Sequence, residues 1–114
     1  MAVDEDLNKR FREAAGADTP LVEKRMMGGI CFMLNGNMLG GADRHQQTRA
    51  GRFMLRIGKH NEQQALKMPG VTSVEQGGRK MGGMIFIDAD SQADAQLNDL
   101  MKLALSNVRQ LPPK

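Results

Sequence analysis

The sequence predicts one α+β domain over residues 1–114, with a small, mostly antiparallel sheet, flanking helices and the order α-β-β-β-α-β-β-α. Strand-like apolar runs fill the middle of the chain, and the links between them are short enough for hairpins. Helical spacing of apolar residues occurs near both ends and in one short segment between them. A chain of this length buries roughly 65% of its unfolded surface, so one core forms without metal or disulfide.

The first helix is expected over residues 4–15. Leu7 and Phe11 lie four residues apart and therefore share one helical face. The acidic run at positions 4–6 suits the positive end of the helix dipole, and Gly16 suits the C-terminal stop.

A β-hairpin follows, with strands over residues 24–34 and 37–41. Asn35-Gly36 between two apolar runs is the strongest short hairpin signal, because a type I′ turn requires positive φ at both central residues. The first strand is apolar on both faces, since Phe32 alternates with Cys31. Both faces should therefore be covered.

Residues 52–57 form the third predicted strand, in which apolar and polar positions alternate. The preceding segment, Gly41–Gly51, is long, polar and basic, and is expected to be a mobile loop. A short helix over residues 60–68 comes next, with Asn61 as its expected N-cap and Pro69-Gly70 as its end.

Two more strands precede the last helix, a weak one over Val71–Gln76 and an apolar one over Met84–Ile87. Ser91–Asp94 resembles a capping box with Asp in place of Glu. Pro112-Pro113 stops the last helix. The apolar face of this last helix is formed by Leu97, Leu100, Met101, Ala104, Val108 and Leu111.

The doubly apolar strands raise the question of what covers the sheet face opposite the helices. A wrapping helix or a second copy of the chain would do so, and a homodimer is expected because large exposed apolar patches are uncommon in monomers. The ten methionines are interpreted as core residues, since most of them lie in apolar runs. No tight methionine cluster supports a Cu(I) thioether site, although Met81 and Met84 lie three residues apart.

Composition indicates a cytoplasmic protein with no membrane partner. The single cysteine, Cys31, excludes an intramolecular disulfide and fits a reducing compartment. The N-terminus is acidic, unlike a secretory leader, and no apolar run is long enough to span a bilayer.

The candidate reactive residues do not form a recognisable catalytic or metal-binding pattern. Cys31 lies in a predicted core strand, and neither His45 nor His60 has an evident carboxylate to orient it. Asp88 and Asp90 resemble the start of a calcium loop whose later ligands are missing. The sequence therefore predicts a non-enzymatic protein without a cofactor.

Four Gly-Gly pairs occur, at positions 28–29, 40–41, 77–78 and 82–83. Glycines at strand ends usually make bulges, tight bends or close backbone approaches, and this interpretation is favoured over an anion-binding nest. If a nest exists at the last pair, Arg79 and Lys80 would be its cationic partners.

The middle of the chain is basic. Residues 44–80 carry a net charge of +6, between segments of −2 and −1. Such a segment attracts polyanions or acidic proteins, although it can also be an ordinary solvated surface. Few aromatic residues are available for base stacking, so non-specific nucleic-acid contact and binding of an acidic protein both stay open. The candidate contacts here are Arg44, Arg49, Arg52, Arg56 and Lys59.

Several sequence blocks occur in a fixed order along nearly the whole chain. K-R-M-M-G-G at 24–29 leads into an apolar strand and N-G-N-M at 35–38. Three further blocks follow: M-L-R-I-G at 54–58, G-R-K-M-G-G with its following strand at 78–88, and L-P-P-K at 111–114. As a set, these blocks resemble the N-terminal domain of the TfoX/Sxy family, regulators linked to natural competence in bacteria.

The resemblance implies a secretion-chaperone-like α+β fold, no catalytic residues, and a part in transcription regulation through protein–protein contacts. A nucleic-acid-binding accessory protein that uses residues 44–59 is the alternative function. The residues that carry the family pattern as structural motifs are Met26, Gly28, Gly29, Asn35, Gly36, Gly82 and Gly83.

Overall fold

The computed structural model describes residues 4–26, 29–44, 47–76, 78–90 and 94–113. It confirms the predicted α+β class. The elements in chain order are α1 (Glu5–Ala15), β1 (Val22–Met26), β2 (Gly29–Leu34), β3 (Asn37–Arg44), β4 (Gly51–Arg56), α2 (Lys59–Leu66), β5 (Val71–Gln76), β6 (Arg79–Asp88) and α3 (Asp94–Arg109).

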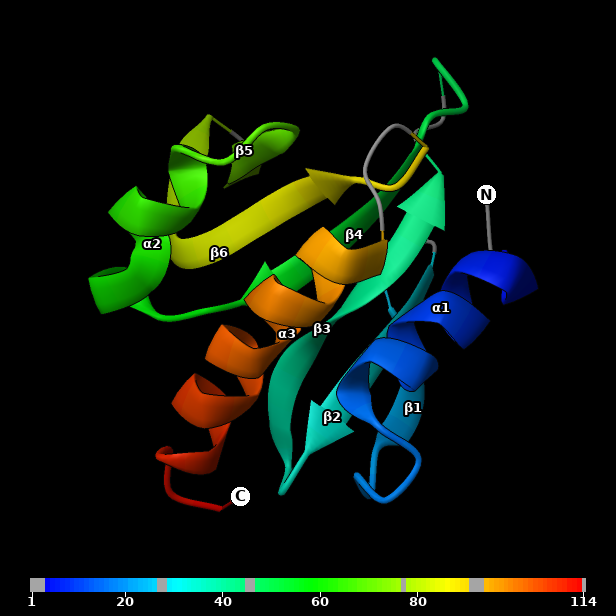
Figure 1. The fold of residues 1–114 in the computed structure, drawn as a ribbon, viewed down its shortest axis with the longest axis vertical. Helices are drawn as coiled ribbons and strands as arrows, with labels where there is room; N and C mark the ends of the chain where they lie inside the picture. Colours follow the sequence, from blue (N-terminus) through cyan, green and yellow to red (C-terminus); the bar gives the residue numbers. More distant parts are fainter. Residues whose placement is uncertain (1–3, 27–28, 45–46, 77, 91–93, 114) are drawn as a thin grey trace.

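The strands form one antiparallel sheet in the order β1-β2-β3-β4-β6-β5, so β1 and β5 are its edges. Figure 1 shows α1 and α3 crossing the same face of this sheet, and α2 lying beside β6. In the part of the chain that the structure describes, no helix has the length and apolarity needed to cross a membrane.

The predicted strand over residues 24–34 is wrong, because the chain reverses within it. Lys24 of β1 pairs with Cys31 of β2, and Gly29 begins β2 after the reversal. Gly28 lies outside the described residues. The Gly28-Gly29 pair is the local turn signal within the apolar run from Met26 to Leu34, and the reversal adds one strand to the predicted order.

The Asn-Gly hairpin between β2 and β3 is confirmed. Asn35 and Gly36 have φ values of 55° and 80°, as a type I′ turn requires, and Leu34 pairs with Asn37 across it. The Asn37 side chain is buried, and its amide nitrogen donates to the Pro112 carbonyl oxygen at 2.9 Å. The segment after α3 is thereby joined to the start of β3.

The main core lies between the sheet and the helices. Phe11 of α1 stacks on Phe32 of β2 with ring centroids 4.5 Å apart, and Phe53 of β4 lies next to them. From α2, Ala65 joins the same core. The other large, fully buried side chains of this core include Leu39, Leu55, Ile57, Ile85, Ile87, Leu97, Leu100 and Met101.

The helix ends agree with the sequence in one case and differ in another. Asp4 caps α1 by accepting from the Asp6 and Leu7 backbone N–H groups, within the acidic run that the sequence places at the positive end of the helix dipole. The prediction that Asn61 caps α2 is wrong, because Gly58 is the N-cap and no side chain bonds there. Instead, the Asn61 side-chain amide nitrogen donates to the Ile57 carbonyl oxygen at 2.9 Å. Residues 91–93 of the expected capping box lie outside the described residues.

β3 and β6 are longer than expected. β3 continues to Arg44 and β4 begins at Gly51, so most of the first half of the predicted loop is strand. β6 begins at Arg79 and bends at Gly83, whose φ is 81°. The carbonyl of Gly83 accepts from the Ile57 and Gly58 N–H groups. This glycine pair therefore makes a bend with close backbone contact, as the sequence favoured.

Candidate interaction surface

The sheet has one face covered by α1 and α3, and we call the opposite side the open face. Directly paired residues of an antiparallel sheet point to the same side, so strand register assigns the side chains. Phe53 and Ile87 pair within the helix-covered core, whereas Met54 and Phe86 pair on the other side. The open face carries Val22, Lys24, Cys31, Met33, Met38, Arg52, Met54, Arg56, Met84 and Phe86.

A second, smaller apolar cluster lies on the open face, and no residue of the described helices takes part in it. Val74 is fully buried, and Met54 and Met84 are 9% and 5% exposed. Partly buried side chains surround these three, namely Met38, Met81 and Phe86. We call these six residues the methionine cluster. They largely bury one another, so their burial does not by itself require a covering helix or a second copy.

Two arginines of β4 frame the methionine cluster. Arg52 makes a bidentate pair with Asp43 at 2.7 and 3.1 Å, and its guanidinium lies 4.2 Å from the centroid of the Phe86 ring. Arg56 lies opposite Met84 and forms no ion pair with any residue that the structure describes. Arg56 is therefore a cation available to a partner at the edge of an apolar patch.

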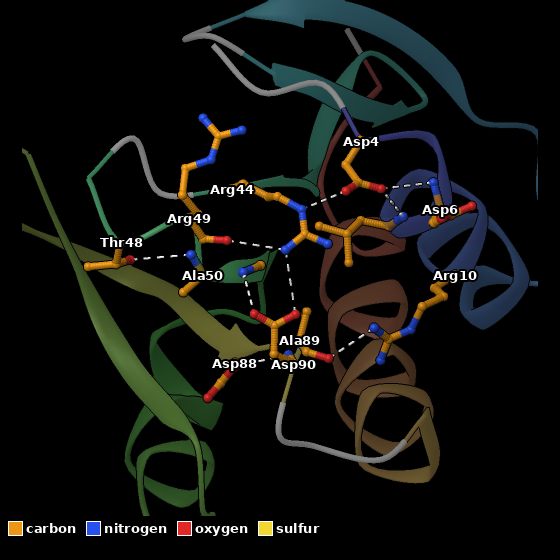
Figure 2. A network of polar contacts seen from close by, with 12 residues as sticks. Asp4, Asp6, Arg10, Arg44, Thr48, Arg49, Ala50, Asp88, Ala89 and Asp90 are labelled. Carbon is orange, nitrogen blue, oxygen red and sulfur yellow. Dashed lines mark hydrogen bonds and ion pairs between the residues drawn. The ribbon is translucent and has the colours of Figure 1, made fainter.

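Arg44 points to the helix side, where it is the centre of a polar network (Figure 2). Its Nε donates to Asp4 at 2.6 Å, and its Nη1 lies 3.2 Å from the Arg49 carbonyl oxygen and 3.6 Å from Asp90. Asp90 also accepts from the Gly51 N–H at 2.8 Å. The Arg44 guanidinium, followed by the N–H groups of the first turn of α1, lowers the pKa of the Asp4 carboxyl.

The same network reaches the loop before α3. Arg10 of α1 donates to the Ala89 carbonyl oxygen at 2.9 Å and pairs with Asp94 at 2.8 Å. The Asp90 N–H donates to the Asp88 carboxylate at 3.0 Å. In Figure 2 the Arg49 side chain points away from the network.

The glycine bend of β6 is held by a buried carboxylate on α2. Glu62 accepts from the Gly83 N–H at 2.7 Å and pairs with Lys80 at 3.0 Å, and its side chain is 10% exposed. The Gly83 N–H, followed by Lys80, lowers the pKa of the Glu62 carboxyl. The N–H that an anion nest at Gly82-Gly83 would use is therefore bound to a carboxylate of the chain itself.

The structure does not bring the basic candidate residues into one patch. Arg44 is held on the helix side, Arg52 and Arg56 lie on the open face, and Lys59 begins α2 beside Gly82. Arg79 and Lys80 lie at the start of β6, at the other end of that strand from the Arg44 network. The net charge of the segment is thus divided between two faces of the sheet.

The candidate reactive residues Cys31 and His60 lie in different surroundings. Cys31 is buried, and burial, followed by the nearby charge of Asp43, raises the pKa of its thiol. His60 is next to Asn61, with their nitrogens 3.2 Å apart, and His45 lies outside the described residues. Among the described residues, no group of three or more His, Cys, Asp or Glu is arranged to hold a metal ion.

The methionine cluster is the feature that sequence reasoning missed. The sequence predicts core packing for the methionines and apolar residues on both faces of two strands, and the periodicity of the strands separates the two sets of residues. In β4 and β6 the odd-numbered positions carry Phe53, Leu55, Ile85 and Ile87, which face the main core. The even-numbered positions carry Met54, Met84 and Phe86, which face the other side.

Comparisons of this chain with protein-family models, curated proteins and solved structures give no match.

Proposed function

We propose that this chain is a non-enzymatic interaction domain, whose open face binds a segment of another protein. The occupant would place apolar side chains against the methionine cluster and a carboxylate against Arg56. The observation that supports this most directly is the position of Arg56, a cation without a described acidic partner, beside an apolar patch that no described helix covers. A transcription-regulatory setting, as the sequence resemblance implies, is part of the proposal.

The composition of the open face favours protein over nucleic acid. Methionine side chains are unbranched and polarisable, so a methionine-rich surface can fit several apolar partners. Phe86 is the aromatic ring of the methionine cluster, and the Arg52 guanidinium covers it at 4.2 Å. Base stacking needs an uncovered ring, so a single-stranded nucleic acid gains less here than an apolar peptide.

The test is selection of peptides from a random phage-displayed library on the purified protein. Selected peptides are expected to combine apolar residues with Asp or Glu. By fluorescence anisotropy, Arg56→Glu should weaken their binding about tenfold or more, since attraction at a desolvated charge pair becomes repulsion. Met38→Gln, which removes apolar contact at nearly constant volume, should weaken binding less.

Arg109→Glu is the matched control, because it makes the same charge change at the end of α3. Equal binding by wild type and both open-face variants would place the peptides elsewhere and contradict the proposal. Binding of oligonucleotides at low salt that is lost in Arg56→Glu, with no selected peptides, would instead establish the nucleic-acid alternative.

A further inference from the structure

The two edges of the sheet differ in how well they could accept another strand. β1 pairs with β2 through five consecutive residue pairs without a register shift. The ladder between β5 and β6 is interrupted between Ser73 and Glu75. Irregularities of this kind protect sheet edges, because they twist the free backbone groups away from an incoming strand. The edge that remains regular and free is β1.

β1 is also exposed at four consecutive positions. Residues 22–25 are all exposed. Among the described residues, Val22 is the one large hydrophobic residue that is exposed, at 59%. The free edge of a strand presents unpaired N–H and C=O groups that can pair with a second strand.

The charges of β1 are arranged so that the strand complements itself. Glu23 and Arg25 both point to the helix side, since they pair with Phe32 and Ile30 of the core face. Among the described residues, Glu23 pairs with Arg12 at 3.4 Å, and Arg25 forms no ion pair. Lys24 lies between them and points to the open face.

We propose that β1 pairs antiparallel with β1 of a second copy, about a twofold axis through Lys24. In this register Glu23 of each copy lies opposite Arg25 of the other, which forms two cross-strand ion pairs on the helix side. An axis through Glu23 would oppose two glutamates, and an axis through Arg25 would oppose two arginines. The charge pattern therefore selects the axis through Lys24 over the two neighbouring axes, which would also keep the helices of both copies on one side.

The arrangement has a cost and a limit. The two Lys24 side chains face each other on the open side, which weakens the pair. A twofold interface uses the same edge on both copies and closes, so it cannot extend into a filament. A seam of five residues is small, and the dimer is weak and concentration-dependent. This surface is separate from the methionine cluster, so the inference goes beyond the proposed function and does not depend on it.

The test is sedimentation equilibrium of wild type, Glu23→Arg and Arg25→Glu, at protein concentrations up to about 1 mM. Each single variant should dimerise about tenfold more weakly than wild type, because two attractive pairs become two repulsive ones. An equimolar mixture of the two variants should recover association. The introduced arginine of one variant then meets the introduced glutamate of the other, and the native Arg25 meets the native Glu23. Recovery in the mixture cannot come from a variant that fails to fold.

Two further variants complete the design. Lys24→Thr should tighten the dimer, because it removes the like-charge contact on the axis. Arg109→Glu, with the same charge change as Arg25→Glu at a distant site, should leave association unchanged. A wild-type protein that stays monomeric at about 1 mM would overturn the inference, and so would a dimer that none of the β1 variants alters.

Discussion

At the scale of single residues, two carboxylates hold distant parts of the chain together. Glu62 joins α2 to the bend of β6 through the Gly83 N–H and Lys80, and Asp4 joins the start of α1 to β3 through Arg44. Both side chains are bound in their ionised form, so folding lowers the pKa of each. Ionised carboxylates that are bonded in the folded state contribute stability that depends on pH.

The free energy of unfolding should depend on pH through these two carboxylates. Because the folded pKa values of Glu62 and Asp4 are lower than the unfolded ones, their stabilisation is complete above the unfolded values, near about pH 4. It is lost as the pH falls through the folded values. Urea unfolding should therefore give a free energy that is constant near neutral pH and declines in acid.

Glu62→Gln should lower the free energy of unfolding at neutral pH by about 1–2 kcal/mol, because it removes a charge-assisted bond to a buried N–H. It should also make the acid decline shallower. Glu13→Gln, at an exposed position of α1, is the control and should change neither quantity. An unchanged acid slope in Glu62→Gln would show that this carboxylate does not carry the effect.

At the scale of elements, the bend of β6 decides how α2 meets the sheet. Gly83 has a φ of 81°, and a Cβ there would lie 3.0 Å from the Lys59 backbone nitrogen and 3.1 Å from the Gly58 carbonyl carbon. Gly78 has a φ of 78°, and a Cβ there would have no described atom within 4 Å. The two glycines thus share a backbone conformation and differ in their surroundings.

Alanine at Gly78 and at Gly83 should therefore lower the free energy of unfolding by different amounts. Gly78→Ala should cost about 1 kcal/mol, the strain of a left-handed conformation. Gly83→Ala should cost about 1–3 kcal/mol more, because the added methyl group also crowds the start of α2. Denaturant unfolding of both variants measures the difference, and equal losses would mean that the close approach to α2 is unimportant.

The elements also show what could be predicted from the sequence and what could not. The bounds of β5 and the Asn35-Gly36 turn were predicted correctly, since Val71–Gln76 is set off by Pro69-Gly70 and the turn by its own two residues. The reversal between β1 and β2 was missed because apolar residues continue on both sides of Gly28-Gly29, and periodicity alone does not distinguish one long strand from two. The binding of Glu62 to Gly83 was missed because its partners lie 21 residues apart.

At the scale of the whole molecule, one sheet with helices on a single side gives unequal protection to its strands. β4 lies between β3 and β6, with the main core on one side and the methionine cluster on the other. β1 and β5 each have one neighbour. Local opening needs less free energy where fewer contacts are broken.

Hydrogen exchange should therefore be slowest for amides of β4 and faster for those of β1 and β5 in dilute protein. Raising the concentration should slow exchange in β1 and leave β5 unchanged if β1 pairs with a second copy. Mass spectrometry of peptides from each strand measures both effects. Equal protection of β4 and the edge strands would contradict the layered arrangement described here.

The Arg44 network sets a practical boundary for protein engineering. The guanidinium at the end of β3 is held by the cap of the first helix and by the loop before the last helix, so the two terminal thirds of the chain are fastened at one point. A shortened version that starts after Asp4 would leave α1 uncapped and the guanidinium with Asp90 as its remaining carboxylate. Trimming or tagging at the front of the molecule should accordingly stop short of that aspartate.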